Sequence, residues 1–150
     1  MRIVIQRVDQ AAVEIDNNLK SSIDRGLLVL VGIEDADSYI DSEWLAGKLV
    51  NLRIFDDENG VMNKSVADID GQILVVSQFT LHAQTKKGNR PSYIKAAKHP
   101  IAIPLYEHFC TEITKLMGKE TQTGTFAADM KVSLVNNGPV TISMDSKNKE

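Results

Sequence analysis

Two short segments of this sequence of 150 residues carry groups that could bind or react with a ligand. In the first, the apolar run 73–76 passes into Ser77-Gln78-Phe79-Thr80, which brings two hydroxyl groups and a carboxamide together. The end of a buried strand, where it opens into a loop, is a common position for binding groups. A serine and a threonine on an exposed strand face are the plainer interpretation.

The second segment is Gly138-Pro139, between the strand-like runs 132–135 and 140–143. An X-Pro bond is cis in only about 5–6% of cases in folded proteins, and a cis bond is usually a retained structural device. The segment Asn136-Asn137-Gly138-Pro139 therefore predicts a tight loop between two strands, with either a special proline or a plain turn.

The common catalytic motifs are absent: the sequence has no Gly-rich phosphate loop, no Cys-x-x-Cys and no His-Glu-x-x-His. The single thiol, Cys110, follows Phe109 in a predicted helix, which favours a packed core cysteine over a nucleophile. His82, His99 and His108 are scattered, so neither a metal site nor a cofactor is predicted. If the protein is an enzyme, its catalysis should depend on backbone groups or on the substrate itself.

The charge is distributed unevenly along the chain. The net charge is −3, yet segment 71–106 contains no acidic residue. The basic residues of that segment are Lys86, Lys87, Arg90, Lys95 and Lys98. A basic stretch on an acidic protein favours a local anionic partner such as a nucleic-acid backbone, with an ordinary solvated loop as the alternative.

Composition predicts one globular domain over residues 1–145, followed by a frayed tail over 146–150. The chain is 43% hydrophobic and 25% charged, close to the average for globular proteins. No apolar run approaches the roughly 20 residues of a membrane helix, so no membrane partner is expected. The first residues alternate like a strand and do not resemble a signal peptide, and a single cysteine suits a reducing compartment. A cytoplasmic protein is therefore expected.

Hydrophobic periodicity predicts the elements that must position these groups. Strands are expected at 2–6, 12–15, 27–31 and 73–76, with the last two buried on both faces. One helix is expected after a cap at Asp37 or Ser38, with the apolar face Ile40, Trp44, Leu45, Leu49 and Leu52. A second helix is expected with Pro104 near its first turn, Gly118 at its end and the apolar face Leu105, Phe109, Ile113, Leu116 and Met117. The predicted fold class is α+β, with mainly antiparallel, barrel-like sheets and two or three packed helices.

Taken together, 77–81 and 136–141 resemble the two signatures of the D-aminoacyl-tRNA deacylases. Other segments fit that family in the same order: 1–8 with Arg7, 26–32, 52–55, 62–63, 87–88, 90–92 and 128–130. The resemblance covers nearly the whole chain. The sequence departs from the family at Asn137 and Gln84, where an aspartate is common, and at Ala127, where glycine is common.

The resemblance implies a homodimer that hydrolyses the ester between a D-amino acid, or glycine, and the 3′ end of tRNA. It implies that the Gly138-Pro139 bond is cis and that this loop enters the active site of the other subunit. The loop's backbone carbonyls would hold the substrate amino group, so that an L side chain collides with it. Arg7 would hold the loop in place.

The resemblance also assigns the catalytic segment Ser77, Gln78, Phe79 and Thr80. Backbone N–H groups near Phe79 and Thr80 would stabilise the oxyanion, Gln78 would orient the substrate, and the 2′-hydroxyl of the terminal adenosine would help to activate water. Thr80 is expected to position the substrate, with a nucleophilic role as the alternative. Phe126 and Met130 are expected either to line an adenosine pocket or to pack in the core.

Lys86, Lys87 and Arg90 would then contact phosphates of the tRNA acceptor stem. Two other functions stay open at this point. One is a non-catalytic RNA-binding module, and the other is an esterase that attacks small substrates with Thr80 or Cys110.

Overall fold

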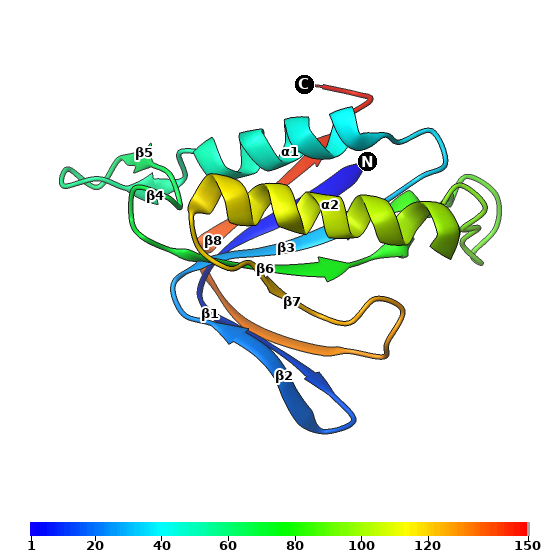
Figure 1. Cartoon of the computed structure of the whole chain (residues 1–150), viewed down its shortest axis with the longest axis horizontal. Coiled ribbons are helices and arrows are strands. Elements are labelled where there is room, and N and C mark those ends of the chain that lie inside the picture. Colours follow the sequence, from blue (N-terminus) through cyan, green and yellow to red (C-terminus); the bar gives the residue numbers. More distant parts are fainter. Residues whose placement is uncertain (150) are drawn as a thin grey trace.

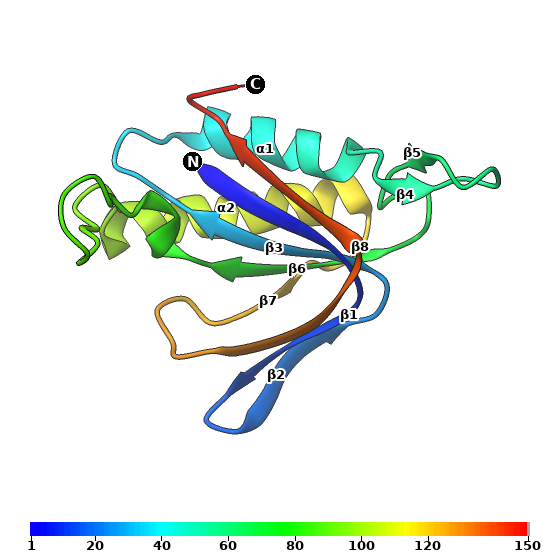
Figure 2. The same ribbon diagram turned by 180° about the vertical axis from the view of Figure 1, so that it is seen from behind.

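The structure is a computed structural model that describes residues 1–149, and over this range it contains eight strands, two α-helices and one 3-10 helix. The strands are β1 (Arg2–Ile15), β2 (Asn18–Ile23), β3 (Gly26–Gly32), β4 (Phe55–Asp56), β5 (Met62–Lys64), β6 (Gln72–Ser77), β7 (Gln122–Thr123) and β8 (Lys131–Asp145). The helices are α1 (Tyr39–Asn51), the 3-10 helix η1 (Phe79–His82) and α2 (His99–Met117). Both α-helices cover the same face of a strongly curved sheet (Figures 1 and 2).

The long strand β1 organises the sheet. Its first half pairs with β3 and its second half with β2, while β8 runs antiparallel along its other edge over almost its whole length. Because one strand belongs to two sets of neighbours, the sheet bends and partly closes beneath the helices (Figure 2). This arrangement confirms the predicted α+β class with barrel-like sheets and two packed helices.

Two strand pairs, β3 with β6 and β6 with β7, are parallel. Parallel neighbours need a long crossover, and here the connection from β3 to β6 contains α1 and the small hairpin β4–β5. This crossover places α1 on the sheet beside α2. It also brings the carboxyl ends of β3 and β6 to one edge of the sheet.

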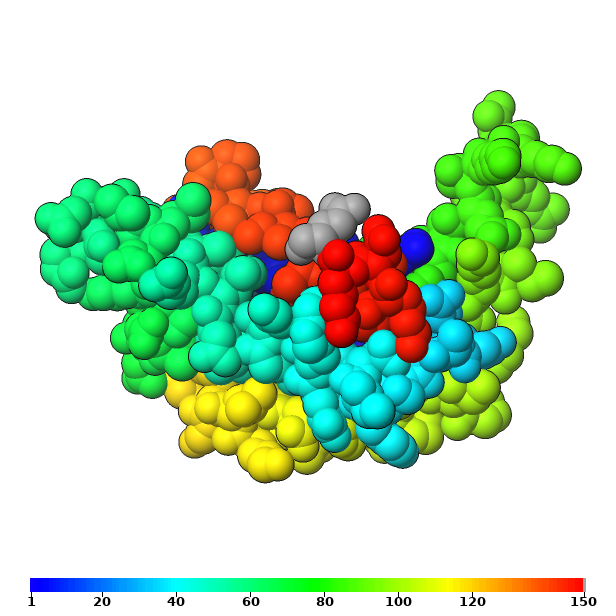
Figure 3. All heavy atoms as spheres, turned by 90° about the horizontal axis from the view of Figure 1, so that it is seen from above, coloured from blue at the N-terminus to red at the C-terminus, as the bar shows by residue number. Residues whose placement is uncertain are grey.

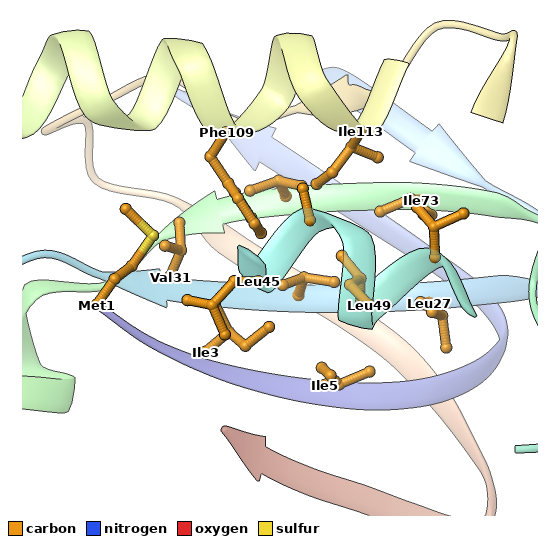
Figure 4. Close-up of a cluster of buried hydrophobic side chains, with 14 of the residues drawn as sticks. Met1, Ile3, Ile5, Leu27, Val31, Leu45, Leu49, Ile73, Phe109 and Ile113 are labelled. Atoms are coloured by element: carbon orange, nitrogen blue, oxygen red, sulfur yellow. The ribbon is translucent and has the colours of Figure 1, made fainter. Parts of the chain in front are cut away.

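The main core lies between the helices and the sheet (Figure 4). Alternate β1 residues Ile3 and Ile5 point toward the helices and are fully buried. Leu45 and Leu49 of α1, one helical turn apart, face them, as the periodicity predicts. Ile40 was expected on the same face but is 77% exposed. It precedes Leu45 by five residues and therefore lies about 140° away around the helix.

Helix α2 begins earlier than the sequence suggests. It starts at His99 with Pro100 in the first turn, so Pro104 lies inside the helix and not near its start. Gly118 ends the helix as predicted, with a left-handed φ of 66°. Phe109 and Ile113 are fully buried, as predicted. By contrast, Leu116 is 46% exposed, which corrects the expected face in the last turn.

The C-terminal segment forms one strand and not two strands around a reversing loop. Both halves of β8 pair with β1, and the register shifts on either side of Val8. Asn136 still pairs with Val8, and residues 137–140 bulge out of the ladder while the chain continues in the same direction. The turn-forming residues of this segment produce a bulge and not a chain reversal, because β1 is long enough to pair with both halves of β8.

The start of the expected frayed tail is fixed to the protein. Ser146 is buried, and its Oγ accepts a hydrogen bond of 2.9 Å from the α-amino group of Met1. Lys147 Nζ donates to Asp41 Oδ2 at 2.8 Å. Neither Ser146 nor Lys147 is therefore frayed, and Glu150, the last residue of that prediction, lies outside the described residues. Of the helices between residues 1 and 149, none has the length and apolar character to cross a membrane.

Candidate functional site

A cavity of about 510 Å³ opens where β3 and β6 end, beside the first turn of α2. Five of the residues predicted for the site line it: Ser77, Gln78, Phe79, Phe126 and Met130. The remaining walls are mostly apolar and include Val31, Ile33, Val76, Ala96, Ala97, Ala102 and Val132. An apolar cavity with a few converging polar groups is the usual form of a small-ligand site.

Thr80 does not line this cavity. Its Oγ1 is 2.7 Å from Gln78 Nε2, which donates a hydrogen bond to it. The backbone N–H of Gln78 donates to the Val31 carbonyl at 2.7 Å, which ties the turn to β3. The immediate partner of the Thr80 hydroxyl is thus a carboxamide and not a base, and the contact fixes the direction of the Gln78 side chain.

The 3-10 helix η1 supplies backbone donors at the same place. Its first internal hydrogen bond runs from Leu81 N–H to the Gln78 carbonyl. The N–H groups of Phe79 and Thr80 precede this bond, and therefore they have no acceptor inside the turn. Such groups can donate to a negatively charged oxygen.

Phe126 and Met130 belong to the loop between β7 and β8, which forms one wall of the cavity. The Phe126 ring packs between His99 and Tyr106, with ring centroids 5.6 Å apart in each pair. Both residues also pack against buried core residues, Phe126 in the cluster under the helices and Met130 in the cluster on the other side of the sheet. Both residues therefore line the cavity and also pack in the core. Between them Ala127 has a left-handed φ of 62°.

Among the polar and charged residues that line the cavity, four were not predicted for the site: Tyr93, Lys98, His99 and Asp129. Lys98 belongs to the basic segment, and its charge was the available signal. Tyr93 contacts Phe79 edge to face, with centroids 5.1 Å apart and an interplanar angle of 76°. Between residues 1 and 149 no group of three or more His, Cys, Asp or Glu side chains could hold a metal ion.

Arg7 holds the Gly138-Pro139 bulge, whose peptide bond is cis. Its Nε donates to the Asn137 carbonyl at 3.0 Å, and its Nη2 donates to Asn137 Oδ1 at 3.3 Å. On the other side, Nη1 donates to the Ile54 carbonyl at 2.6 Å. The guanidinium group therefore connects the bulge to the segment after α1.

Two further contacts fix the bulge. Asn137 Nδ2 donates to Asp9 Oδ1 at 2.7 Å, and the N–H of Val140 donates to Asn136 Oδ1 at 3.0 Å. Gly138 has a φ of 131°, and a Cβ there would lie 2.8 Å from Val140 Cγ2. The bulge is exposed, but it is not free to move as a flexible loop would.

The bulge and the cavity are separate within one chain. Neither Arg7 nor Gly138 nor Pro139 lines the cavity. In Figure 3 the middle of β8, in orange, rises left of the centre, whereas the basic loop, in green, projects from the far right of the same side of the molecule. The chain thus brings together the first predicted motif with Phe126 and Met130, but not with the second motif.

The basic residues lie on a loop closed at its base. Gln84 and Ser92 exchange two backbone hydrogen bonds of 2.8 and 3.0 Å. Lys86, Lys87 and Arg90 are exposed on the loop that this bridge closes. The loop projects from the body of the protein, where a large anion can reach it (Figure 3).

Two other reactive groups are unsuited to catalysis. Burial raises the pKa of the Cys110 thiol to about 12, so the thiolate is scarce near neutral pH. Ser42 Oγ lies 2.6 Å from His108 Nδ1, a spacing typical of a nucleophile and its base. However, Ser42 is fully buried and donates to the Tyr39 carbonyl, so a substrate cannot reach it.

Comparison with known proteins agrees with this geometry. The family model described as D-Tyr-tRNA(Tyr) deacylase matches residues 4–145. Proteins named D-aminoacyl-tRNA deacylase from Parabacteroides distasonis and Bacteroides fragilis are 67% and 65% identical to this chain, over the full length of both sequences.

Two solved structures share the fold. The c-Myc DNA unwinding element binding protein has a TM-score of 0.92 and 39% identity, covering 97% of this chain and 98% of its own. A probable eukaryotic D-amino acid tRNA deacylase has a TM-score of 0.82 at 19% identity, covering 95% of this chain and 97% of its own. The chain therefore belongs to the D-Tyr-tRNA(Tyr) deacylase family, whose members are hydrolases of the aminoacyl-tRNA ester bond.

Proposed function

We propose that this protein hydrolyses the ester bond of D-aminoacyl-tRNA, and of tRNA mischarged with glycine, to release free tRNA and the amino acid. One observation carries the proposal for a chain of this family. The cavity joins Ser77, Gln78 and Phe79 with Phe126 and Met130, directly beside backbone N–H groups that have no acceptor in their own turn. We expect the reaction to take place in the cytoplasm.

The chemistry needs an attacking water and donors for the charge that develops on the ester oxygen. The N–H groups of Phe79 and Thr80 would supply the donors, each typically contributing about 2.7–4 kcal/mol. The 2′-hydroxyl of the terminal adenosine would help to activate the water. Thr80 has Gln78 as its hydrogen-bond partner, which supports a positioning role over a nucleophilic one.

Selection for the D configuration would come from a second copy of the chain. In this proposal the protein is a homodimer, and the Gly138-Pro139 bulge of one copy enters the cavity of the other. Its backbone carbonyls would bind the substrate amino group, and an L side chain would collide with the bulge, whereas glycine has no side chain to collide. Two features support this role: the bulge is exposed yet held by Arg7, and it lies outside the cavity of its own chain.

The basic loop would contact phosphates of the tRNA. Lys86, Lys87 and Arg90 are exposed and can bind them without reading the base sequence. Replacing Lys86 and Lys87 by alanine should weaken tRNA binding. The slope of log K against log salt should fall by about 1–2, because each lost phosphate contact contributes about 0.7–0.9. An unchanged slope would remove these lysines from the interface.

The decay of D-Tyr-tRNA and L-Tyr-tRNA in the presence of the purified protein tests the activity. Loss of the D ester with the L ester spared is expected. Binding of tRNA without hydrolysis would instead indicate an RNA-binding module. Complete loss of activity in folded Thr80→Ala or Cys110→Ala protein would indicate covalent catalysis.

Mixing two inactive variants tests the cross-subunit bulge. Gln78→Ala impairs the cavity, and Arg7→Ala releases the bulge, so each homodimer should be inactive. A mixed dimer contains one intact cavity facing one intact bulge. After random exchange of subunits, half of the dimers are mixed, and each mixed dimer has one working site out of two. About a quarter of wild-type activity should therefore return. No recovery, despite subunit exchange shown by differently tagged copies, would refute the cross-subunit arrangement.

A further inference from the structure

We infer that the Tyr93 ring, supported by Phe79, is a stacking platform for the base that precedes the terminal adenosine on the single-stranded 3′ end of tRNA. The inference rests on the proposed function and adds a second nucleotide site to it. It also explains why two large aromatic side chains are exposed beside a cavity.

The first support is the arrangement of the two rings at the rim of the cavity. Both residues line it, yet Phe79 is 56% and Tyr93 is 38% exposed. Their edge-to-face contact, with an angle of 76°, leaves at least one ring face free for a third ring. Unstacked bases of single-stranded nucleic acids bind proteins through such faces.

The second support is the position of Tyr93 along the path that a bound strand would take. Tyr93 directly follows Ser92, which closes the basic loop with Gln84. The cations of that loop lie on one side of this bridge, and the cavity lies on the other. A strand with its terminal nucleoside in the cavity and its phosphates on the loop must therefore pass Tyr93.

The third support is that Tyr93 lies on a fixed turn and not on the loop tip. Its carbonyl accepts a hydrogen bond of 3.0 Å from Ala96 N–H, and Ala97 N–H donates to the Ile33 carbonyl at 2.9 Å. These bonds tie the turn to the end of β3. A ring held in advance loses little freedom when a base stacks on it.

Three D-tyrosyl ester substrates distinguish binding at this site from binding in the adenosine pocket. The first is the ester of adenosine alone, the second is the ester of the dinucleotide cytidylyl-adenosine, and the third is the ester of the same dinucleotide without the cytosine base (the abasic ester). In the wild type, the dinucleotide should have a kcat/KM about 5- to 150-fold above that of the abasic ester, the range typical of one base–aromatic stack. Most of the difference should appear in KM. Because stacking tolerates any base, a uridine or guanosine in place of the cytidine should retain most of this gain.

Variants assign the gain to the ring. Tyr93→Leu should lose most of the difference between dinucleotide and abasic ester, and it should slow hydrolysis of the dinucleotide ester by a larger factor than hydrolysis of the adenosine ester. Tyr93→Phe should keep the difference. Ile94→Ala is the matched control, because Ile94 is the next residue, is 78% exposed and does not line the cavity.

Each other outcome has a defined meaning. Equal rates for the dinucleotide and abasic esters in the wild type would overturn the inference without any mutation, and so independently of folding. Equal losses on the adenosine and dinucleotide esters in Tyr93→Leu would also overturn it, because Tyr93 would then serve the first nucleoside. Failure of the wild-type protein to hydrolyse any D-tyrosyl ester or D-Tyr-tRNA would instead refute the proposed function.

Discussion

Replacing Asn137 by aspartate tests how firmly the Gly138-Pro139 bulge is held. The Asn137 carboxamide links the bulge to β1 twice, since its oxygen accepts from Arg7 Nη2 at 3.3 Å and its nitrogen donates to Asp9 Oδ1 at 2.7 Å. Asn137→Asp keeps the size and the acceptor but replaces the donor with a second anion beside Asp9. The bulge should therefore lose its contact with Asp9 and be pushed away from it.

The expected magnitude follows from these contacts. A surface hydrogen bond to a charged group contributes about 1 kcal/mol. Two like charges about 4 Å apart repel by roughly 1 kcal/mol in water and about 4 kcal/mol at an effective dielectric constant of 20. The new charge also attracts Arg7, which offsets about 1 kcal/mol of this loss. Because Asp9 and Asn137 are both exposed, the repulsion should lie near the value in water, and we expect the free energy of unfolding to fall by about 1–2 kcal/mol and the ratio of D to L hydrolysis to decrease.

A double-mutant cycle isolates the contact. Asp9→Asn alone should have little effect, because two carboxamides can still hydrogen-bond. In the Asn137→Asp background, Asp9→Asn should restore a donor and recover about 1–2 kcal/mol as coupling energy. Urea unfolding at one fixed protomer concentration measures all four proteins. Additive effects of the two substitutions, or Asn137→Asp with wild-type stability and unchanged D to L ratio, would show that the contact does not hold the bulge.

Three further predictions concern other positions. Gly138→Ala should lower the free energy of unfolding by about 1–3 kcal/mol, because φ is 131° and the new Cβ would lie 2.8 Å from Val140 Cγ2; wild-type stability in urea would contradict this. Since burial raises the pKa of Cys110 to about 12, roughly one thiol in ten thousand is ionised at pH 8, and iodoacetamide should label the native protein far more slowly than the unfolded one. Burial raises the pKa of the Asp41 carboxyl, but hydrogen bonds led by that from Lys147 outweigh it and hold this pKa well below its ordinary value. The resulting stability is therefore present above about pH 4 and lost as pH falls, so Asp41→Asn should remove on the order of 2 kcal/mol at pH 7 and flatten the acid limb of the unfolding profile.

Elements with a strong local signal could be predicted from the sequence. The apolar runs of β3 and β6 are buried, and the spacing of Leu45 with Leu49 and of Phe109 with Ile113 identifies the helix faces. Local patterns suffice here because a continuous apolar run reflects a strand buried on both faces, and helical spacing reflects burial of one face of a helix. It fails at Ile40, which lies about 140° around α1 from Leu45, and at Leu116 in the last turn of α2.

Features that depend on distant parts of the chain could not be predicted in this way. Residues 136–139 contain the side chains of a turn, but whether the chain reverses depends on the length of β1, which binds both halves of β8. Tyr93 and Asp129 join the cavity from two separate loops, and a single residue in a loop has no periodicity to identify it. The resemblance to a family identified Phe126 and Met130 because it supplies information about tertiary contacts that composition does not contain.

The proposed selection for the D configuration depends on how the sheet positions the cavity and the bulge. The cavity is fixed by the ends of β3 and β6, and the bulge is fixed by Arg7 and Asp9 of β1, which pairs with β3. One rigid sheet thus sets the distance and direction between cavity and bulge. In a two-fold dimer, the contact that brings one bulge to the partner's cavity necessarily brings the second bulge to the first cavity. A flexible loop would move away from an L side chain at little cost. A bulge that is held by hydrogen bonds to its own strand stays in place and therefore excludes that side chain.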